Sequence, residues 1–220
     1  MSTFRHLLIL IVISSLILAS CSNNTVTDID GNHYRTVTIG TQVWMAENLN
    51  VTHYRNGDSI PNIDINENWG ELKSGAYGNY DNDTIMAETY GRLYNWYAVN
   101  DSRGIAPEGW HIPSAKEWQE LADFLGGDSL AGGNMKEKGT THWLEPNTGS
   151  ANESGFSSLP AGDRSGMGNF YDINDLTYYW STTEDSSGHI AVRGLSFENA
   201  KLGIFHADKQ DGLSIRCIKD

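Results

Sequence analysis

The alternation of apolar and polar positions is clearest in residues 30–49, DGNHYRTVTIGTQVWMAENL. Residues 34–39 alternate between two faces, Gly40-Thr41 provide a turn, and residues 42–45 lead the chain back. A period of two on both sides of a glycine-containing turn is typical of paired strands. This segment therefore predicts a β-hairpin.

A helical period follows in residues 109–127, GWHIPSAKEWQELADFLGG. Apolar residues recur at steps of three and four over residues 115–125, which places them on one face of a helix. Ser114 and Glu117 match the S-x-x-E capping box, in which each side chain bonds the backbone of the other residue. Because two glycines follow Leu125, the pattern predicts a capped helix that ends there.

Trp110, His111 and Trp118 crowd the start of this helix, and such a cluster could stack a sugar or hold a metal ion. A metal site needs further ligands at workable spacing, and a lone histidine beside structural aromatics does not supply them. We therefore assign the two tryptophans to the core and His111 to the scaffold.

The C-terminal part of the chain is rich in predicted strands. Four segments of β-forming residues are separated by short polar turns: YYWSTT (178–183), HIAVRGLSF (189–197), KLGIFHA (201–207) and LSIRCIK (213–219). They predict two hairpins that form an antiparallel sheet.

Two stretches, residues 50–88 and 126–177, carry no sustained period and are rich in Gly, Asn, Asp and Ser, which predicts long irregular loops. Between them, residues 90–101, YGRLYNWYAVND, predict a short helix. Two short helices, antiparallel strands and long loops are typical of an α+β domain.

The N-terminus resembles a bacterial lipoprotein signal. Arg5 precedes the apolar stretch 7–18, which is shorter than the ~20 residues of a membrane-spanning helix. Leu18-Ala19-Ser20-Cys21 resembles a lipobox, so residues 1–20 are predicted to be removed and Cys21 to carry acyl chains that anchor the protein in a membrane. Residues 21–29 would form the lipidated cysteine and its tether, and residues 30–220 a single domain. Ser22 is not the aspartate that retains many lipoproteins at the inner membrane, so we expect the outer membrane, with its periplasmic or external face left open.

Charge and cysteine content restrict the function further. Without residues 1–20 the chain has 14 basic and 28 acidic residues, a net charge of −14, which disfavours nucleic-acid binding. With Cys21 lipidated, Cys217 has no partner for a disulfide within the chain. Its apolar neighbours predict a buried, unreactive thiol.

Seven motifs along the chain, in order, resemble the Fibrobacter succinogenes major paralogous domain: IGTQVWMAENL, YGRLYNWYAV, APEGWHIPSAKEWQELADFLGG, HWLEPN, NESGFSSLPAGDR, YYWSTTE and GLSIRCIKD. The resemblance covers about Asp30 to Asp220. It implies a C-type-lectin-like fold, more remotely similar to the formylglycine-generating enzyme domain, in secreted proteins and lipoproteins of Bacteroidetes. It implies no particular activity. Gly78 and Ala106 stand where family members often have cysteine, so the lectin-like disulfide expected of Cys217 is absent.

Several motifs suggest calcium. Glu145-Pro146-Asn147 matches the EPN triplet of calcium-dependent lectins, but Trp180 is followed by Ser-Thr-Thr in place of Asn-Asp. Other oxygen-rich clusters fit solvated turns at least as well; they are residues 28–32, 81–83 and 172–175. The sequence predicts no cofactor and leaves a structural calcium ion open.

The loops carry the candidate ligand-binding residues. Trp69 lies in an irregular loop outside the family motifs, where an exposed tryptophan would suit sugar recognition. The other candidates, in the last long loop, are Asp163, Arg164, Phe170 and Tyr171.

No enzyme motif accompanies these candidates: the sequence has no G-x-S-x-G, H-E-x-x-H, G-x-x-x-x-G-K or C-x-x-C. We therefore predict a lipid-anchored module that binds a glycan or protein ligand without catalysis. Two alternatives stay open: a structural or assembly subunit of a surface complex, and an enzyme revealed by a polar cleft with perturbed carboxylates or histidines.

Overall fold

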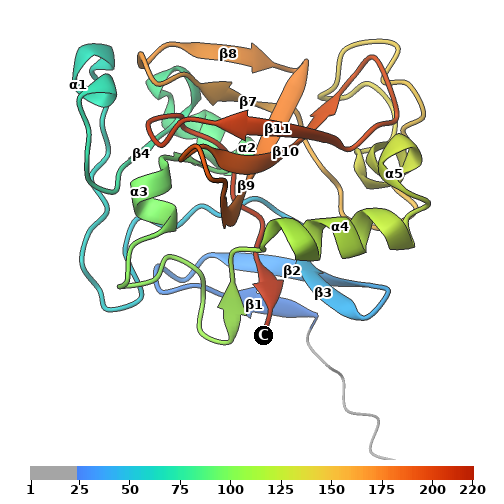
Figure 1. The fold of residues 1–220 in the computed structure, drawn as a ribbon, viewed down its shortest axis with the longest axis horizontal. Coiled ribbons are helices and arrows are strands. Elements are labelled where there is room, and N and C mark those ends of the chain that lie inside the picture. Colours follow the sequence, from blue (N-terminus) through green and yellow to red (C-terminus); the bar gives the residue numbers. More distant parts are fainter. Residues whose placement is uncertain (1–23) are drawn as a thin grey trace, which may run out of the picture.

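The computed structural model describes residues 24–220, so the predicted signal peptide and the predicted lipidation site Cys21 lie outside the described residues. It confirms the α+β class, with two five-stranded sheets at opposite ends of the molecule and helices packed between and beside them (Figure 1). The α-helices are α1 (Asn66–Gly70), α2 (Thr84–Tyr90), α3 (Trp96–Val99), α4 (Ala115–Phe124) and α5 (Asp128–Met135), with a short 3₁₀ helix η1 (Tyr80–Asn82). Among residues 24–220, no helix combines the length and the apolar character needed to cross a membrane.

The first sheet has the strand order β1-β2-β3-β12-β6 and is antiparallel throughout. Its strands are β1 (Thr25–Thr27), β2 (His33–Ile39), β3 (Gln42–Met45), β12 (Ile218–Lys219) and β6 (Trp110–His111). The predicted hairpin is confirmed as β2 and β3. Strand β1 pairs with β2 from Thr25 onward. Part of the segment predicted as a tether, residues 21–29, is therefore part of the folded domain.

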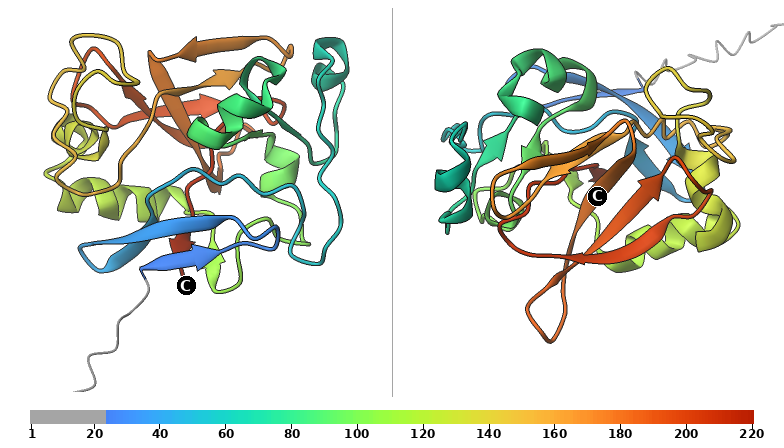
Figure 2. Two further views of the ribbon diagram at one scale, coloured as in Figure 1. Left: turned by 180° about the vertical axis from the view of Figure 1, so that it is seen from behind. Right: turned by 90° about the horizontal axis from the view of Figure 1, so that it is seen from above.

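The second sheet has the order β11-β10-β9-β7-β8, in which only β7 and β9 run parallel. Its strands are β11 (Gly203–Ala207), β10 (Ile190–Ser196), β9 (Leu176–Glu184), β7 (Ala161–Arg164) and β8 (Phe170–Ile173). A two-stranded ribbon, β4 (Tyr77–Gly78) with β5 (Leu93–Tyr94), lies beside it. The views in Figure 2 show the two sheets facing each other across the molecule.

Three predictions of local structure were wrong. The two stretches read as loops contain α1, α2, α5, β7 and β8 as well as shorter elements. The helix predicted over 90–101 is reduced to α3, preceded by strand β5. The last predicted strand, 213–219, is a regular strand only at β12, where it joins the first sheet, and it meets β5 and β9 through single bridges at Leu213 and Ser214.

The capped helix is confirmed in detail. Ser114 Oγ accepts a hydrogen bond from Glu117 N at 3.3 Å, and Glu117 Oε2 accepts one from Ser114 N at 2.8 Å. Trp118, on the buried face of α4, packs against Trp44 with ring centroids 4.7 Å apart and donates through Nε1 to the carbonyl of Trp180. The helix therefore joins the core between the two sheets.

All seven tryptophans of the chain are buried. This confirms the core assignment of Trp110 and Trp118. His111 is scaffold as well, because its Nδ1 contacts Asp220 Oδ1 at 2.7 Å and its Nε2 contacts Glu117 Oε1 at 2.8 Å. Burial alone would lower the pKa of His111, but these two carboxylates outweigh it and raise the pKa.

Cys217 is a free, fully buried cysteine, and burial raises its pKa. We expect the thiol to react with a disulfide reagent such as DTNB far more slowly in the native protein than in denaturant, because the thiolate is the reacting species and the folded chain shields it. Fast native labelling would contradict the buried assignment.

Cys217→Ser should fold, with a free energy of unfolding lower by about 1–3 kcal/mol, because it buries a hydroxyl in place of an apolar sulfur.

Candidate functional site

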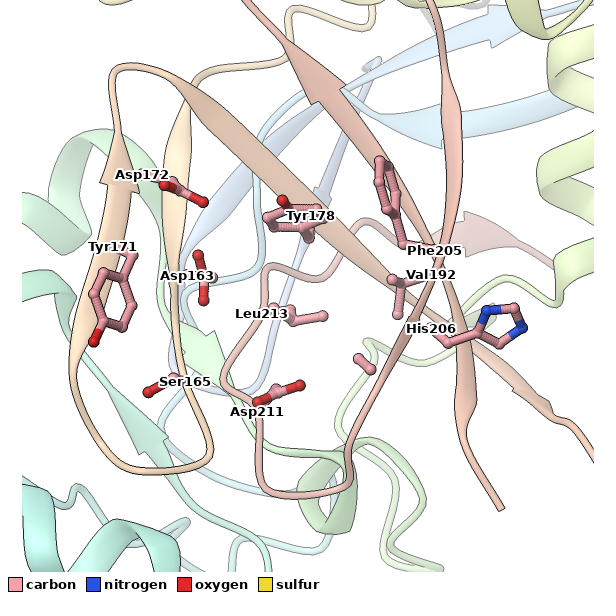
Figure 3. Close-up of a pocket in the computed structure, with 11 residues that line it drawn as sticks. Asp163, Ser165, Tyr171, Asp172, Tyr178, Val192, Phe205, His206, Asp211 and Leu213 are labelled. Atoms are coloured by element: carbon pink, nitrogen blue, oxygen red, sulfur yellow. The ribbon is translucent and has the colours of Figure 1, made fainter. Parts of the chain in front are cut away.

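A cavity of about 320 Å³ lies on one face of the second sheet, beside the chain segment that leads from β11 toward β12 (Figure 3). Three aspartates, Asp163, Asp172 and Asp211, line it from one side. Two aromatic rings, Tyr178 and Phe205, line it from the other, with Leu213 between the two groups. The cavity therefore combines acidic and aromatic groups.

Strand geometry places the aspartates. Asp163 and Arg164 are consecutive in β7, so their side chains point to opposite faces of the sheet, and only Asp163 lines the cavity. Asp163 is paired with Tyr171 of β8. The next residue, Asp172, has a φ of 64°, outside the extended range of a regular strand. Both Tyr171 and Asp172 line the cavity.

Asp211 enters from outside the sheet and is held by the backbone. Its Oδ1 accepts a hydrogen bond from Gly166 N at 2.8 Å, and its Oδ2 accepts one from Asp208 N at 2.9 Å. These bonds connect the loop between β7 and β8 to the segment after β11. They fix the third carboxylate at the edge of the cavity.

The electrostatics of the cavity disfavour ionised carboxylates. Burial, the charges of Asp172 and Asp211, and a hydrogen bond between the Asp163 and Asp172 carboxyl groups together raise the pKa of Asp163 to about 7. Burial also raises the pKa of Asp172, and it raises that of Asp211 although backbone donors oppose the shift. The eleven lining residues include no lysine or arginine, and the ring of His206 points away from the cavity (Figure 3). The negative charge in the cavity is therefore not balanced by a lining cation.

The aromatic wall depends on glycine. The rings of Tyr178 and Phe205 meet edge to face, with centroids 5.5 Å apart and planes at 89°. Between their strands lies Gly194 of β10, where a Cβ atom would come within 2.7 Å of the Phe205 ring and 2.9 Å of the Tyr178 ring. Burial and the nearby aspartates raise the pKa of Tyr178 to about 12, so its hydroxyl stays neutral.

The structure brings together two of the five predicted ligand-binding residues. Asp163 and Tyr171 line the cavity, and Tyr171 is half exposed at its rim. Phe170 does not line it; its ring packs on Tyr80 at 5.3 Å and on the guanidinium of Arg164 at 4.7 Å.

Trp69 and Arg164 are corrected to structural residues. Both are completely buried, with the Arg164 guanidinium 4.2 Å from the centre of the Trp69 ring. Trp69 Nε1 donates to the carbonyl of Gln210 at 2.7 Å, which a sequence pattern cannot reveal because the two residues are 141 positions apart. Trp69 therefore cannot present its ring to a sugar, although it supports the segment that carries Asp211.

Glu145 and Asn147 are not among the residues that line the cavity. Asn147 is buried, and its Nδ2 donates to the carbonyls of Glu137 at 3.0 Å and Gly139 at 2.6 Å. Its Oδ1 makes no hydrogen bond within the described part of the chain, whereas Glu145 is exposed. Residues 24–220 contain no group of three or more His, Cys, Asp or Glu side chains arranged to hold a metal ion.

The other oxygen-rich clusters form turns and caps. Asp28 Oδ1 accepts hydrogen bonds from the backbone of Asp30 and Asn32, both at 2.9 Å. Asp83 caps α2 by accepting from Ile85 N at 2.8 Å. Asn174 and Asp175 form the turn between β8 and β9. These residues form turns and caps, whereas Asp172 of the third cluster lines the cavity.

Sequence reasoning missed Asp211, Tyr178 and Phe205 as cavity residues. One signal was present: Gly194 and Gly203 interrupt predicted strands, and a glycine inside a strand often marks a close approach by another group. In the structure the Phe205 ring lies over both glycines.

Two five-stranded sheets with an acidic, aromatic-lined cavity define the protein as an α+β domain with a small-molecule-sized hollow. In a comparison with family models, the Fibrobacter succinogenes major domain matches residues 37–219. The chain belongs to this family. No curated protein and no solved structure matches the chain.

Proposed function

We propose that this protein is a lipid-anchored, lectin-like module that binds a glycan in the cavity of the second sheet. One observation carries the proposal: the cavity places aromatic rings opposite carboxyl groups that no lining cation neutralises. Its volume of about 320 Å³ is at the lower end of the ~300–1,000 Å³ typical of small-molecule sites. It is therefore suited to a ligand group as small as one sugar unit.

A sugar matches both walls of the cavity. The apolar face of a sugar ring can pack against Tyr178 and Phe205, while its hydroxyl groups donate to carboxylate oxygens of Asp172 and Asp211. Neutral sugars meet no charge penalty, and a sugar that carries an amine gains from the carboxylates. Acidic sugars are disfavoured by the same carboxylates. We therefore infer that the ligand is a neutral or amine-bearing glycan.

A glycan array tests this proposal. The full-length protein in detergent micelles is applied in calcium and again in EDTA, beside the variant Asp211→Asn. We expect a signal on neutral or amine-bearing glycans in both buffers, lost in the variant, and none on sialylated or uronic-acid glycans. Silence in both buffers would overturn glycan binding. A signal lost in EDTA would instead assign the ligand to a calcium site such as Glu145 and Asn147.

The cavity has perturbed carboxylates, the feature that would favour an enzyme. General acid and base catalysis needs two groups whose pKa values are pushed apart, so that one is protonated and the other ionised. Here burial raises the pKa values of Asp163, Asp172 and Asp211 alike, with that of Asp163 reaching about 7. Raised pKa values alone assign neither role, so we propose binding and name no catalytic residue.

One feature favours an assembly role as the second candidate. Strand β11 forms an edge of the second sheet, with Ile204 and Phe205 exposed. An exposed, apolar edge strand can pair with a further strand from another chain. Stable oligomers on size exclusion that are lost in Ile204→Lys would favour this role.

Membrane anchoring is tested through Cys21. We expect Cys21→Ala to move the protein from the membrane fraction to the soluble fraction, because the acyl chains would supply most of the membrane affinity at ~0.8 kcal/mol per buried CH₂. Fractionation followed by immunoblotting measures the change, with Cys217→Ala as the matched control that keeps the anchor. An unchanged membrane fraction in Cys21→Ala would refute lipid anchoring.

A further inference from the structure

A second hollow, of about 110 Å³, lies on the same sheet, and Tyr178 and Phe205 line it as well as the acidic cavity. Its apolar part comes from Leu176 and Leu195, whereas Ser196, Asn199 and Lys201 add polar groups. The two hollows therefore adjoin along this aromatic pair.

The surface that connects the hollows is kept low by two glycines. Gly194 and Gly203 are paired across β10 and β11, and both line the second hollow. Any side chain at Gly194 would collide with both rings of the aromatic pair, and at Gly203 it would collide with the Phe205 ring. Because glycine weakens strands, two paired glycines in adjacent strands need a packing reason. Here they leave room for the Phe205 ring, which lines both hollows.

The hollows differ in chemistry. The acidic cavity is lined by three aspartates without a lysine or arginine, whereas the second hollow has no acidic lining residue and includes Lys201. The two adjoining sites therefore differ in charge and offer different contacts. A ligand with at least two successive units can use both. A single sugar would leave one of them unused.

We propose that the glycan ligand is an oligosaccharide of at least two units, which crosses the Tyr178–Phe205 pair with one unit in the acidic cavity and one face of the next unit seated in the smaller second hollow. This inference rests on the proposed function, since it extends the same site. The aromatic pair is the shared contact of both units. Ligand length therefore determines affinity, and the second hollow supplies the gain.

Isothermal titration calorimetry with N-acetylglucosamine and its β-1,4-linked oligomers of two to six units, which bring no ammonium group next to Lys201, tests the proposal on the full-length protein in detergent. We expect the dimer to bind at least about tenfold more tightly than the monomer, equal to ~1.4 kcal/mol. We expect little further gain beyond the units that the two hollows hold. Deacetylated oligomers of the same lengths show how an amine changes the affinity at each of the two sites.

Ser196→Phe fills the second hollow and should remove the length-dependent gain while the monomer still binds. Ser187→Phe adds the same ring to an exposed turn and serves as the matched control, expected to keep the gain.

Equal affinities for monomer and dimer, with monomer binding lost in Asp211→Asn, would overturn the two-site inference and leave the proposed function standing. No binding of any length would overturn both. A gain that survives Ser196→Phe in a folded variant would also overturn the assignment to the second hollow.

Discussion

Asp163→Asn is expected to stabilise the folded protein at pH 8 by about 1–2 kcal/mol and to weaken glycan binding. The pKa of Asp163 is raised to about 7 from an ordinary value of 3.8, mainly by burial and then by the charges of Asp172 and Asp211. Each unit of such a shift corresponds to ~1.4 kcal/mol, and partial exposure of the side chain to solvent reduces the full effect. Asparagine keeps the shape and removes the charge.

The sign of the pH dependence follows from the raised pKa. In the folded state Asp163 keeps its proton up to about pH 7, whereas in the unfolded chain it ionises near pH 4. The stability that this group contributes is therefore fully present below pH 4 and is lost as the pH rises to about 7. Urea unfolding at pH 4 and pH 8 should show a small difference between variant and wild type at the lower pH and the full difference at the higher.

Asp123→Asn, an exposed aspartate near the end of α4, is the matched control, with an expected change within about 0.5 kcal/mol at either pH. Destabilisation by Asp163→Asn at pH 8 would contradict the electrostatic assignment. A more stable variant that binds amine-bearing sugar several-fold less tightly would show that the carboxylate is kept for binding at a cost in stability.

Arg164→Leu is expected to lower the free energy of unfolding by about 3 kcal/mol, the largest loss that we predict. Its guanidinium is fully buried and lies between Trp69 and Phe170. Nε donates to the carbonyl of Gly168 at 2.9 Å, Nη2 donates to Asn66 Oδ1 at 3.2 Å, and Nη1 donates to the carbonyl of Ile63. Leucine leaves these acceptors without their donor.

Chemical denaturation of Arg164→Leu measures this loss, and Arg35→Leu is the control. Arg35 forms an ion pair with Glu47 at 2.5 Å, but its side chain is 69% exposed, so its removal should cost less than about 1 kcal/mol. Similar losses in the two variants would contradict the structural role of Arg164. In Arg164→Leu we also expect weaker glycan binding, because Trp69 and Gln210 support the segment that holds Asp211.

Local patterns predicted the parts of the fold that depend on local interactions. The hairpin β2–β3 and the capped helix α4 follow from alternation, turn residues and a capping box, all within about a dozen residues. Helix α5 was not predicted, because its sequence, DSLAGGNM, contains two glycines, which usually indicate a loop. A Cβ atom on Gly132 would lie 2.7 Å from a methyl carbon of Leu195, so close packing explains the glycine there.

The candidate site was predicted less completely than the fold. Asp163 and Tyr171 came from the predicted loop. Asp211 joins them because distant residues hold its segment: Gly166 N donates to Asp211, and Trp69 donates to the carbonyl of the neighbouring Gln210. The burial of Trp69 could not be predicted either, because a tryptophan in a polar stretch is exposed unless a distant residue such as Arg164 covers it.

If Cys21 carries the proposed lipid anchor, the early start of β1 determines how the domain is oriented on the membrane. Only residues 22–24 separate Cys21 from this strand, so a lipid anchor at Cys21 would hold the first sheet close to the bilayer surface. The second sheet lies at the far end of the molecule (Figures 1 and 2). The acidic cavity would then stand off the bilayer by the thickness of the domain, where a long polysaccharide can approach sideways without meeting the lipid headgroups.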